Sequence, residues 1–141
     1  MSDTRILEIQ SPLGKDVLLI DRFEGVEAIS DLFRFRVELR SKDKAIDPDA
    51  IIGKGVTVGL KLFRKEEGPQ DVRYFHCVVE RFGRTDEDDD YGHYRAELVP
   101  WLALLARRAD CRIFQAQTVP QILGHVFDFL VSKPGKDDGL L

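Results

Sequence analysis

The chain has 141 residues and a formal net charge of −4, which suits one compact domain and argues against nucleic acid as the main partner. No apolar run approaches the roughly 20 residues that a membrane-spanning helix needs, and the first ten residues lack the pattern of a secretory signal. Two cysteines are too few for a disulfide framework. We therefore expect a domain that is cytoplasmic when it is made.

The first third of the chain predicts three strands. Residues 6–9 and 17–23 are the first two, joined by the turn sequence at 11–14, and Gly25 is expected to end the second. The clearest strand spans residues 33–40, where Phe, Phe, Val and Leu alternate with Arg, Arg, Glu and Arg. Because side chains on a strand alternate between its faces, this pattern predicts an antiparallel strand with one apolar face and one charged face.

The middle of the chain predicts three long strands in a meander. Alternating apolar residues begin at Val56, and the segments 73–82 and 91–99 are also rich in β-forming residues. The polar segments 64–71 and 84–90 separate them and are expected to be hairpin tips. Several strands with short turns favour a barrel or a sandwich.

The last third predicts two helices. Residues 101–108 have short helical character, and Thr118 with Gln121 forms a capping box at the start of a helix over 119–131. The fold class is thus mainly β with α (α+β): an antiparallel β-barrel or strongly curved sheet of about six to seven strands within 1–131, followed by a tail at 132–141. The residues expected in the structural core are Phe33, Phe35, Val37, Trp101, Leu104, Cys111, Phe114, Ile122 and Val126.

No constellation of catalytic residues is evident, so we expect no enzyme, cofactor or metal. The acidic run 86–90 places carboxylates at EF-hand spacing, but Tyr91 stands where the calcium loop needs glycine and the flanks are strands, so a solvated hairpin tip is favoured. A metal hydrolase that uses His76 and His93 is a weaker hypothesis, since neither has the spacing of a zinc ligand set.

The charged faces of the strands leave two interpretations open. Charged side chains on a sheet usually face water, which makes a solvated face the simpler one. The functional one is a wet lumen or a protein interface, where arginine is enriched. The candidate interface residues are Arg34, Arg36, Arg40, Arg73 and Arg81. A stand-alone β-barrel module that binds a ligand or cargo protein through this face is the alternative function.

Several motifs in order also resemble one known family. They are Ile29-Ser30 with LFRFRVEL at 32–39, IIGK at 51–54, RYFHCVV at 73–79, YRAELVPWL at 94–102, DCRIFQ at 110–115 and Thr118-Val119-Pro120. Together they resemble the N-terminal region of VgrG, the type VI secretion spike, which is similar to phage baseplate hub proteins. One departure is Cys77, which stands where the family usually has glycine, and family members are several times longer.

The resemblance implies a role in assembly. It implies a tube-type β-barrel in the hub of a homotrimeric spike that docks on the Hcp tube ring, with baseplate components or effectors as further partners. It implies export by the type VI system without a signal peptide. It also implies that strands further along the chain complete the barrel, so a chain that ends at Leu141 is expected to leave a sheet edge open.

Overall fold

The computed structural model describes residues 5–62, 71–107 and 111–131. The chain divides into two compact units, Met1–Arg107 and Arg108–Leu141. The expected tail at 132–141 and the expected hairpin tip from 64 to 70 lie outside the described residues. Each unit is described below by itself.

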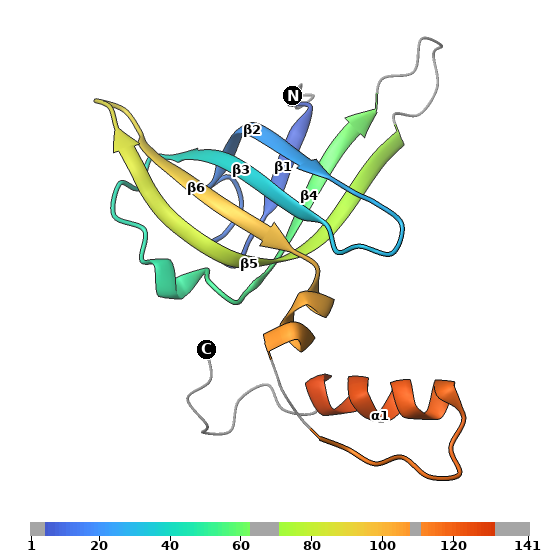
Figure 1. The fold of residues 1–141 in the computed structure, drawn as a ribbon. Helices are drawn as coiled ribbons and strands as arrows, with labels where there is room; N and C mark the ends of the chain where they lie inside the picture. Colours follow the sequence, from blue (N-terminus) through green and yellow to red (C-terminus); the bar gives the residue numbers. More distant parts are fainter. Residues whose placement is uncertain (1–4, 63–70, 108–110, 132–141) are drawn as a thin grey trace. The chain divides into compact units, whose positions relative to one another are not determined.

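The first unit is one six-stranded antiparallel sheet with the strand order β1-β4-β5-β6-β3-β2 (Figure 1). The strands are β1 (Leu7–Gln10), β2 (Leu19–Val26), β3 (Arg34–Ser41), β4 (Gly55–Leu62), β5 (Asp71–Glu87) and β6 (Gly92–Val99). The predicted curved antiparallel sheet is confirmed, and the meander corresponds to β4, β5 and β6.

The long strand β5 makes the sheet curl into a half-barrel (Figure 1). Its first half pairs with β4 and its second half pairs with β6. The β5–β6 ladder has register shifts between Val79 and Arg81 and between Arg84 and Asp86. Such irregularities increase the bend and twist of a strand, so a single strand serves both walls of the half-barrel.

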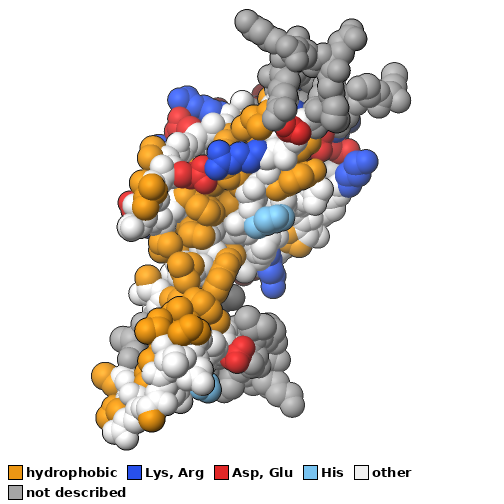
Figure 2. Space-filling view, turned by 90° about the vertical axis from the view of Figure 1, so that its right-hand side faces the viewer, with side chains coloured by type: hydrophobic (Ala, Val, Ile, Leu, Met, Phe, Trp, Pro, Cys, Tyr) orange, Lys and Arg blue, Asp and Glu red, His pale blue; other side chains and the backbone are white. Residues whose placement is uncertain are grey.

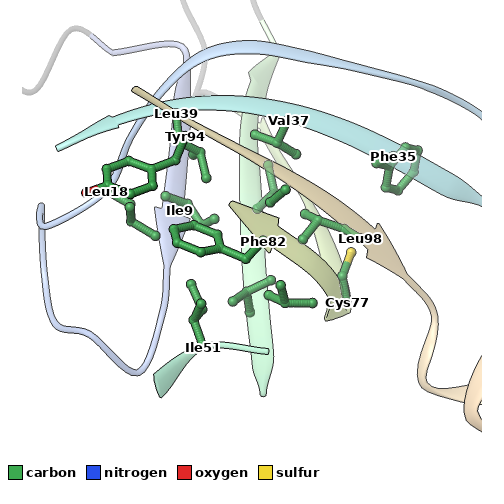
Figure 3. Close-up of a cluster of buried hydrophobic side chains, with 14 of the residues drawn as sticks. Ile9, Leu18, Phe35, Val37, Leu39, Ile51, Cys77, Phe82, Tyr94 and Leu98 are labelled. Atoms are coloured by element: carbon green, nitrogen blue, oxygen red, sulfur yellow. The ribbon is translucent and has the colours of Figure 1, made fainter. Parts of the chain in front are cut away.

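The hydrophobic core fills the inside of this curl, and Figure 3 shows its side chains pointing toward one another from several strands. Phe35 and Val37 are buried, as the alternation on β3 predicted. The Phe35 ring stacks at 4.6 Å from Phe33, and Phe75 meets it edge-on at 5.1 Å. At the other end, Phe82 and Tyr94 stack at 5.1 Å. Aromatic pairs of this geometry add to the stabilisation that burial supplies.

Phe33 is partly buried and packs against the core, but the six remaining residues expected there are exposed or only partly buried. Trp101 is 48% exposed and Cys111 is exposed. Four more are only partly buried, namely Leu104, Phe114, Ile122 and Val126. For Trp101 and Leu104 the reason is that the inner face of the sheet already fills the curl with its own side chains.

The helical segments agree with the predicted positions. A 3-10 turn, η1, spans Pro48–Ala50, and a second, η2, spans Trp101–Arg107 where a short helix was expected. The helix α1 spans Val119–Val131. One bond of the predicted capping box is present: the Thr118 N–H donates to the Gln121 side-chain oxygen at 2.8 Å, and the Thr118 hydroxyl also donates to that oxygen at 3.1 Å.

Gly25 does not end β2, which corrects the expectation from sequence. The strand continues to Val26, and Gly25 pairs with Phe35 on β3. A Cβ atom at this position would lie 2.2 Å from the Phe35 ring and 2.7 Å from the Arg34 carbonyl oxygen. The glycine therefore lets the Phe35 ring lie directly against the backbone of β2.

We predict that Gly25→Ala destabilises the chain by about 1–3 kcal/mol, the usual cost of overpacking a core. Gly83→Ala on β5 is the matched control, because a Cβ there meets nothing within 4 Å. The measurement is the free energy of unfolding in urea. Equal stability of the two variants would contradict this account of Gly25.

Candidate interaction surfaces

The outward side chains of β2, β3, β6 and the second half of β5 form a charged face. Cross-strand neighbours on it alternate in sign. One row runs Glu24, Arg36, Glu97 and Arg81, and the next runs Arg22, Glu38 and Arg95. The charged face comprises Arg22, Glu24, Arg34, Arg36, Glu38, Arg40, Glu80, Arg81, Arg95 and Glu97. Opposite charges placed directly across a ladder are mildly stabilising.

The arginines of this face are paired within the chain. Arg36 lies 3.7 Å from Glu24, Arg81 lies 4.0 Å from Glu97, and Arg40 lies 3.3 Å from Asp21. These pairs are exposed, where an ion pair contributes only about 0–1 kcal/mol. The pairing supports the solvated-face interpretation for most of the charged face.

Glu80 is the best-enclosed group on the charged face. Its side chain is 13% exposed and accepts hydrogen bonds from Arg34 on β3 and from Arg107 on η2, the latter at 2.7 Å. Arg34 also donates to Glu97 at 3.0 Å. The Arg34 hydrogen bond, helped by Arg107, lowers the pKa of the Glu80 carboxyl below its usual range. Glu80 thus ties β3, β5 and η2 together.

Arg73 does not belong to the charged face, although the sequence grouped it with the other four arginines. It is an even number of residues from Phe75 and Cys77, so it points to the inner side of β5. Its guanidinium lies 4.6 Å from the Phe75 ring centre and pairs with Glu27 at 2.5 Å. Arg73 therefore covers the aromatic end of the core.

The outward side chains of β1, β4 and the first half of β5 form a second surface, here called the tyrosine face. Its rows across the ladders are Glu8-Gly59-Tyr74 and Gln10-Thr57-His76, and Lys61 pairs with Val72. Its members are Ile6, Glu8, Gln10, Thr57, Gly59, Lys61, Val72, Tyr74, His76 and Val78. Among the described residues, its fixed charges are Glu8 and Lys61, which pair at 2.8 Å.

Sequence reasoning missed the tyrosine face because it searched for charged residues. A pattern in the sequence does indicate this face. The alternate positions of residues 57–61 and 72–78 that point outward are almost free of charged residues, whereas the outward positions of β3 carry arginines. Figure 2 shows one side of the molecule, where several Lys and Arg side chains adjoin Asp or Glu side chains amid hydrophobic and uncharged surface.

An open seam separates the two edge strands, β1 and β2. They stand at opposite ends of the sheet order and do not pair with each other. A cavity of about 820 Å³ lies between them and is lined by both strands, with Leu7, Ile9, Leu18 and Ile20 among its apolar residues. The Ser11 hydroxyl at this seam is buried and has no hydrogen-bond partner among the described residues.

The acidic run is a self-contained hairpin turn. The Asp88 carboxylate accepts the N–H groups of Asp90 and Tyr91 at 2.8 and 2.7 Å and contacts the His93 ring at 2.8 Å. The His93 contact and these N–H groups lower the pKa of Asp88 to about 2. His76 instead bonds Thr57 on the tyrosine face. No group of three metal-binding side chains occurs within the described residues.

The two cysteines differ in environment. Cys77 is buried in the core, and desolvation raises the pKa of its thiol to about 11. Cys111 is exposed in the second unit. A buried thiol of raised pKa is unreactive at neutral pH, so Cys77 is a packing residue in this fold.

Comparison with known proteins gives the chain a family context. The family model described as phage tail baseplate hub (GPD) matches residues 26–137. Among solved structures, a protein of E. coli described as a component of the type VI secretion system, similar to the T4 bacteriophage tail proteins gp27 and gp5, matches with a TM-score of 0.65 and 29% identity. That match covers 94% of this chain and 33% of the other.

Curated relatives are named as type VI secretion spike proteins. The type VI secretion spike protein VgrG1c of Pseudomonas aeruginosa is 41% identical over 88% of this chain, and VgrG1a of the same organism is 38% identical over 90%. This chain spans 16% and 19% of the length of those two proteins. In the described part of the chain, none of the helices has the length and apolarity to cross a membrane.

We predict that Glu80→Gln lowers the free energy of unfolding by about 1 kcal/mol at pH 7, because two arginines lose their shared carboxylate. Glu38→Gln is the matched control, since Glu38 is exposed and contacts Arg95 at 3.5 Å; its cost should stay within about 0.5 kcal/mol.

The difference between wild type and Glu80→Gln should depend on pH. The pKa of Glu80 is lower in the folded chain, so its contribution is complete above the unfolded value of about 4.3 and is lost as pH falls through the folded value. Urea unfolding at pH 7 and at successive pH values below 4 measures this. A difference that persists unchanged at the lowest pH would overturn the assignment.

Proposed function

Because this chain belongs to the phage tail baseplate hub family, we propose that it is a structural hub module of a type VI secretion spike, which forms a homotrimer and docks on the Hcp tube ring. The observation that supports this most is the match over residues 26–137 to the hub family, together with relatives named as spike proteins. The module would be exported with the spike by the same system. Its role is assembly, and the chemistry of the chain serves packing and pairing.

The geometry is consistent with an assembly module. The polar groups of the first unit go into ion pairs, a turn and the capping of an aromatic cluster. The two large outward surfaces, by contrast, are strand faces of different character on the outside of the curl. Extended strand faces are suited to contacts between subunits, whereas a catalytic site needs converging groups in a pocket.

We also propose that the β1–β2 seam receives a further strand that closes the barrel. Two unpaired edges border one cavity, and both contribute apolar side chains to it. An extended segment would pair with both edges and give the Ser11 hydroxyl a polar neighbour. The chain spans a small part of its relatives, which contain enough additional polypeptide to supply such a strand.

The assembly proposal predicts a mass near three times 16.1 kDa for the purified chain. It also predicts co-elution with the Hcp ring of Pseudomonas aeruginosa, the organism of VgrG1c. Light scattering coupled to size-exclusion chromatography measures both, with VgrG1c as the positive control. A single-copy mass and no co-elution, under conditions where VgrG1c binds the ring, would remove the proposal for this chain.

The seam proposal predicts protection of β1 and β2 when further polypeptide of a spike protein is supplied. The rest of VgrG1c, outside the region aligned with this chain, is added as a separate polypeptide. Hydrogen exchange of the edge amides of β1 and β2 should then slow by about tenfold or more, as expected for newly paired amides. The central strand β6 is the internal control and should not change. Unchanged exchange at both edges in a complex shown to form would refute the seam assignment.

A further inference from the structure

The exposed hydrophobic side chains of the first unit are unevenly distributed. Within the described part of this unit, the connections at residues 11–18, 42–54 and 88–91 hold no exposed large hydrophobic side chain. Such side chains lie instead near the start of β1 and β5, at the end of β4, around the β2–β3 connection and just after β6. They are Ile6, Val26, Ile29, Leu32, Leu62, Tyr74 and Trp101.

Four of these residues mark the shared end of three neighbouring strands. β6, β3 and β2 are adjacent in the sheet, and the start of β3 pairs with the end of β2 and with the end of β6. The β2–β3 connection and the residues after β6 therefore lie at the same end of this wall (Figure 1). This end, here called the apolar end, comprises Val26, Ile29, Leu32 and Trp101. Exposed apolar clusters of this kind are typical of interaction sites.

The loop that carries Ile29 is held in a defined shape. Glu27 pairs with Arg73 on β5 at 2.5 Å, and the Asp31 side chain accepts the N–H of the next residue at 2.8 Å. Ser30 has a φ of 65°, a left-handed conformation that costs energy for a residue other than glycine. Ile29 lies between these fixed points and is 99% exposed, so it projects from the fold and contributes nothing to the core.

Ion pairs within the chain take up charges in both segments of the apolar end. Glu27 in the loop binds Arg73, and Arg107 at the end of η2 binds Glu80. The most exposed hydrophobic side chain there is Ile29. Permanent interfaces bury apolar surface, whereas partners that associate and separate meet through more polar surface. The apolar end is therefore suited to a permanent contact.

We propose that the apolar end is covered by the spike polypeptide that follows the region corresponding to this chain, with Ile29 seated in an apolar socket of that polypeptide. The chain leaves the sheet at this end, because η2 follows β6 and the first unit ends at Arg107. This chain spans only 16% and 19% of VgrG1c and VgrG1a, so these relatives contain the further polypeptide that such a contact needs. The inference rests on the proposed hub function and names a contact separate from the strand pairing at the seam.

Replacement of Ile29 tests the contact without disturbing the fold. The part of VgrG1c that follows its aligned region is added as a separate polypeptide, and its affinity for this chain is measured by isothermal titration calorimetry. Ile29→Ser should weaken binding by about tenfold or more, as expected when a buried apolar anchor is lost, whereas Ile29→Val should retain it. Because Ile29 is 99% exposed, both variants should keep the urea unfolding midpoint of wild type.

Photo-crosslinking identifies the occupant of the apolar end. Ile29→p-benzoylphenylalanine places the probe in the loop, and Asp49→p-benzoylphenylalanine is the matched control at an exposed position in η1, which follows the opposite end of β3. Each variant is irradiated in a mixture that contains the VgrG1c polypeptide and the Hcp ring. Position 29 should give products with the VgrG1c polypeptide, and position 49 should not. Products from position 29 with the ring alone, or with another copy of this chain alone, would overturn the assignment.

The outcomes separate this inference from the proposed function. If wild type forms a trimer and co-elutes with the Hcp ring, but Ile29→Ser binds the VgrG1c polypeptide as tightly as wild type, the apolar-end assignment is wrong and the hub function stands. A wild-type chain that does not bind the VgrG1c polypeptide also refutes the assignment. The hub function fails with it only if that chain neither forms a trimer nor co-elutes with the ring.

Discussion

The bend of β5 is the constraint on which the rest of the first unit depends. This strand pairs with β4 along its first half and with β6 along its second half, so it belongs to both walls of the half-barrel. Its inward residues Phe75, Cys77, Val79 and Phe82 run along the core from one end to the other. If β5 were straight, the apolar faces of β3 and β4 would lie on one flat surface and remain in water.

The bend also determines where an outward carboxylate meets its arginine partners. At the register shift beside Arg81, Glu80 is an extra residue in β5, and it turns outward between Arg34 and Arg107. The enclosed carboxylate therefore results from the same irregularity that curves the sheet. The charges beyond it alternate in sign across the ladders, so arginine and carboxylate side chains there pair with each other.

Local patterns predicted the parts of the fold that depend on neighbouring residues. The alternation at residues 33–40 and the capping box at Thr118 were sufficient for β3 and for the start of α1. Such local patterns do not predict the register between strands that are distant in the sequence, nor the position of a bulge. Arg73 and Arg81 look equivalent in sequence, yet the bulge beside Glu80 places them on opposite sides of β5. Trp101 looked like a core residue because large aromatic residues usually are, but the sheet supplies its own core.

The remaining open surfaces differ in what could satisfy them. The β1–β2 seam exposes unpaired backbone edges beside an apolar cavity. Another strand can pair with such edges through its backbone, independently of its side chains. Within the tyrosine face, the backbone groups of the inner strand β4 are already paired in the ladders to β1 and β5, so β4 offers only its side chains. Closure of the seam by backbone pairing is therefore suited to an extended segment of polypeptide. Because β1 borders the seam and also carries Glu8 on the tyrosine face, pairing at the seam would also order that end of the tyrosine face.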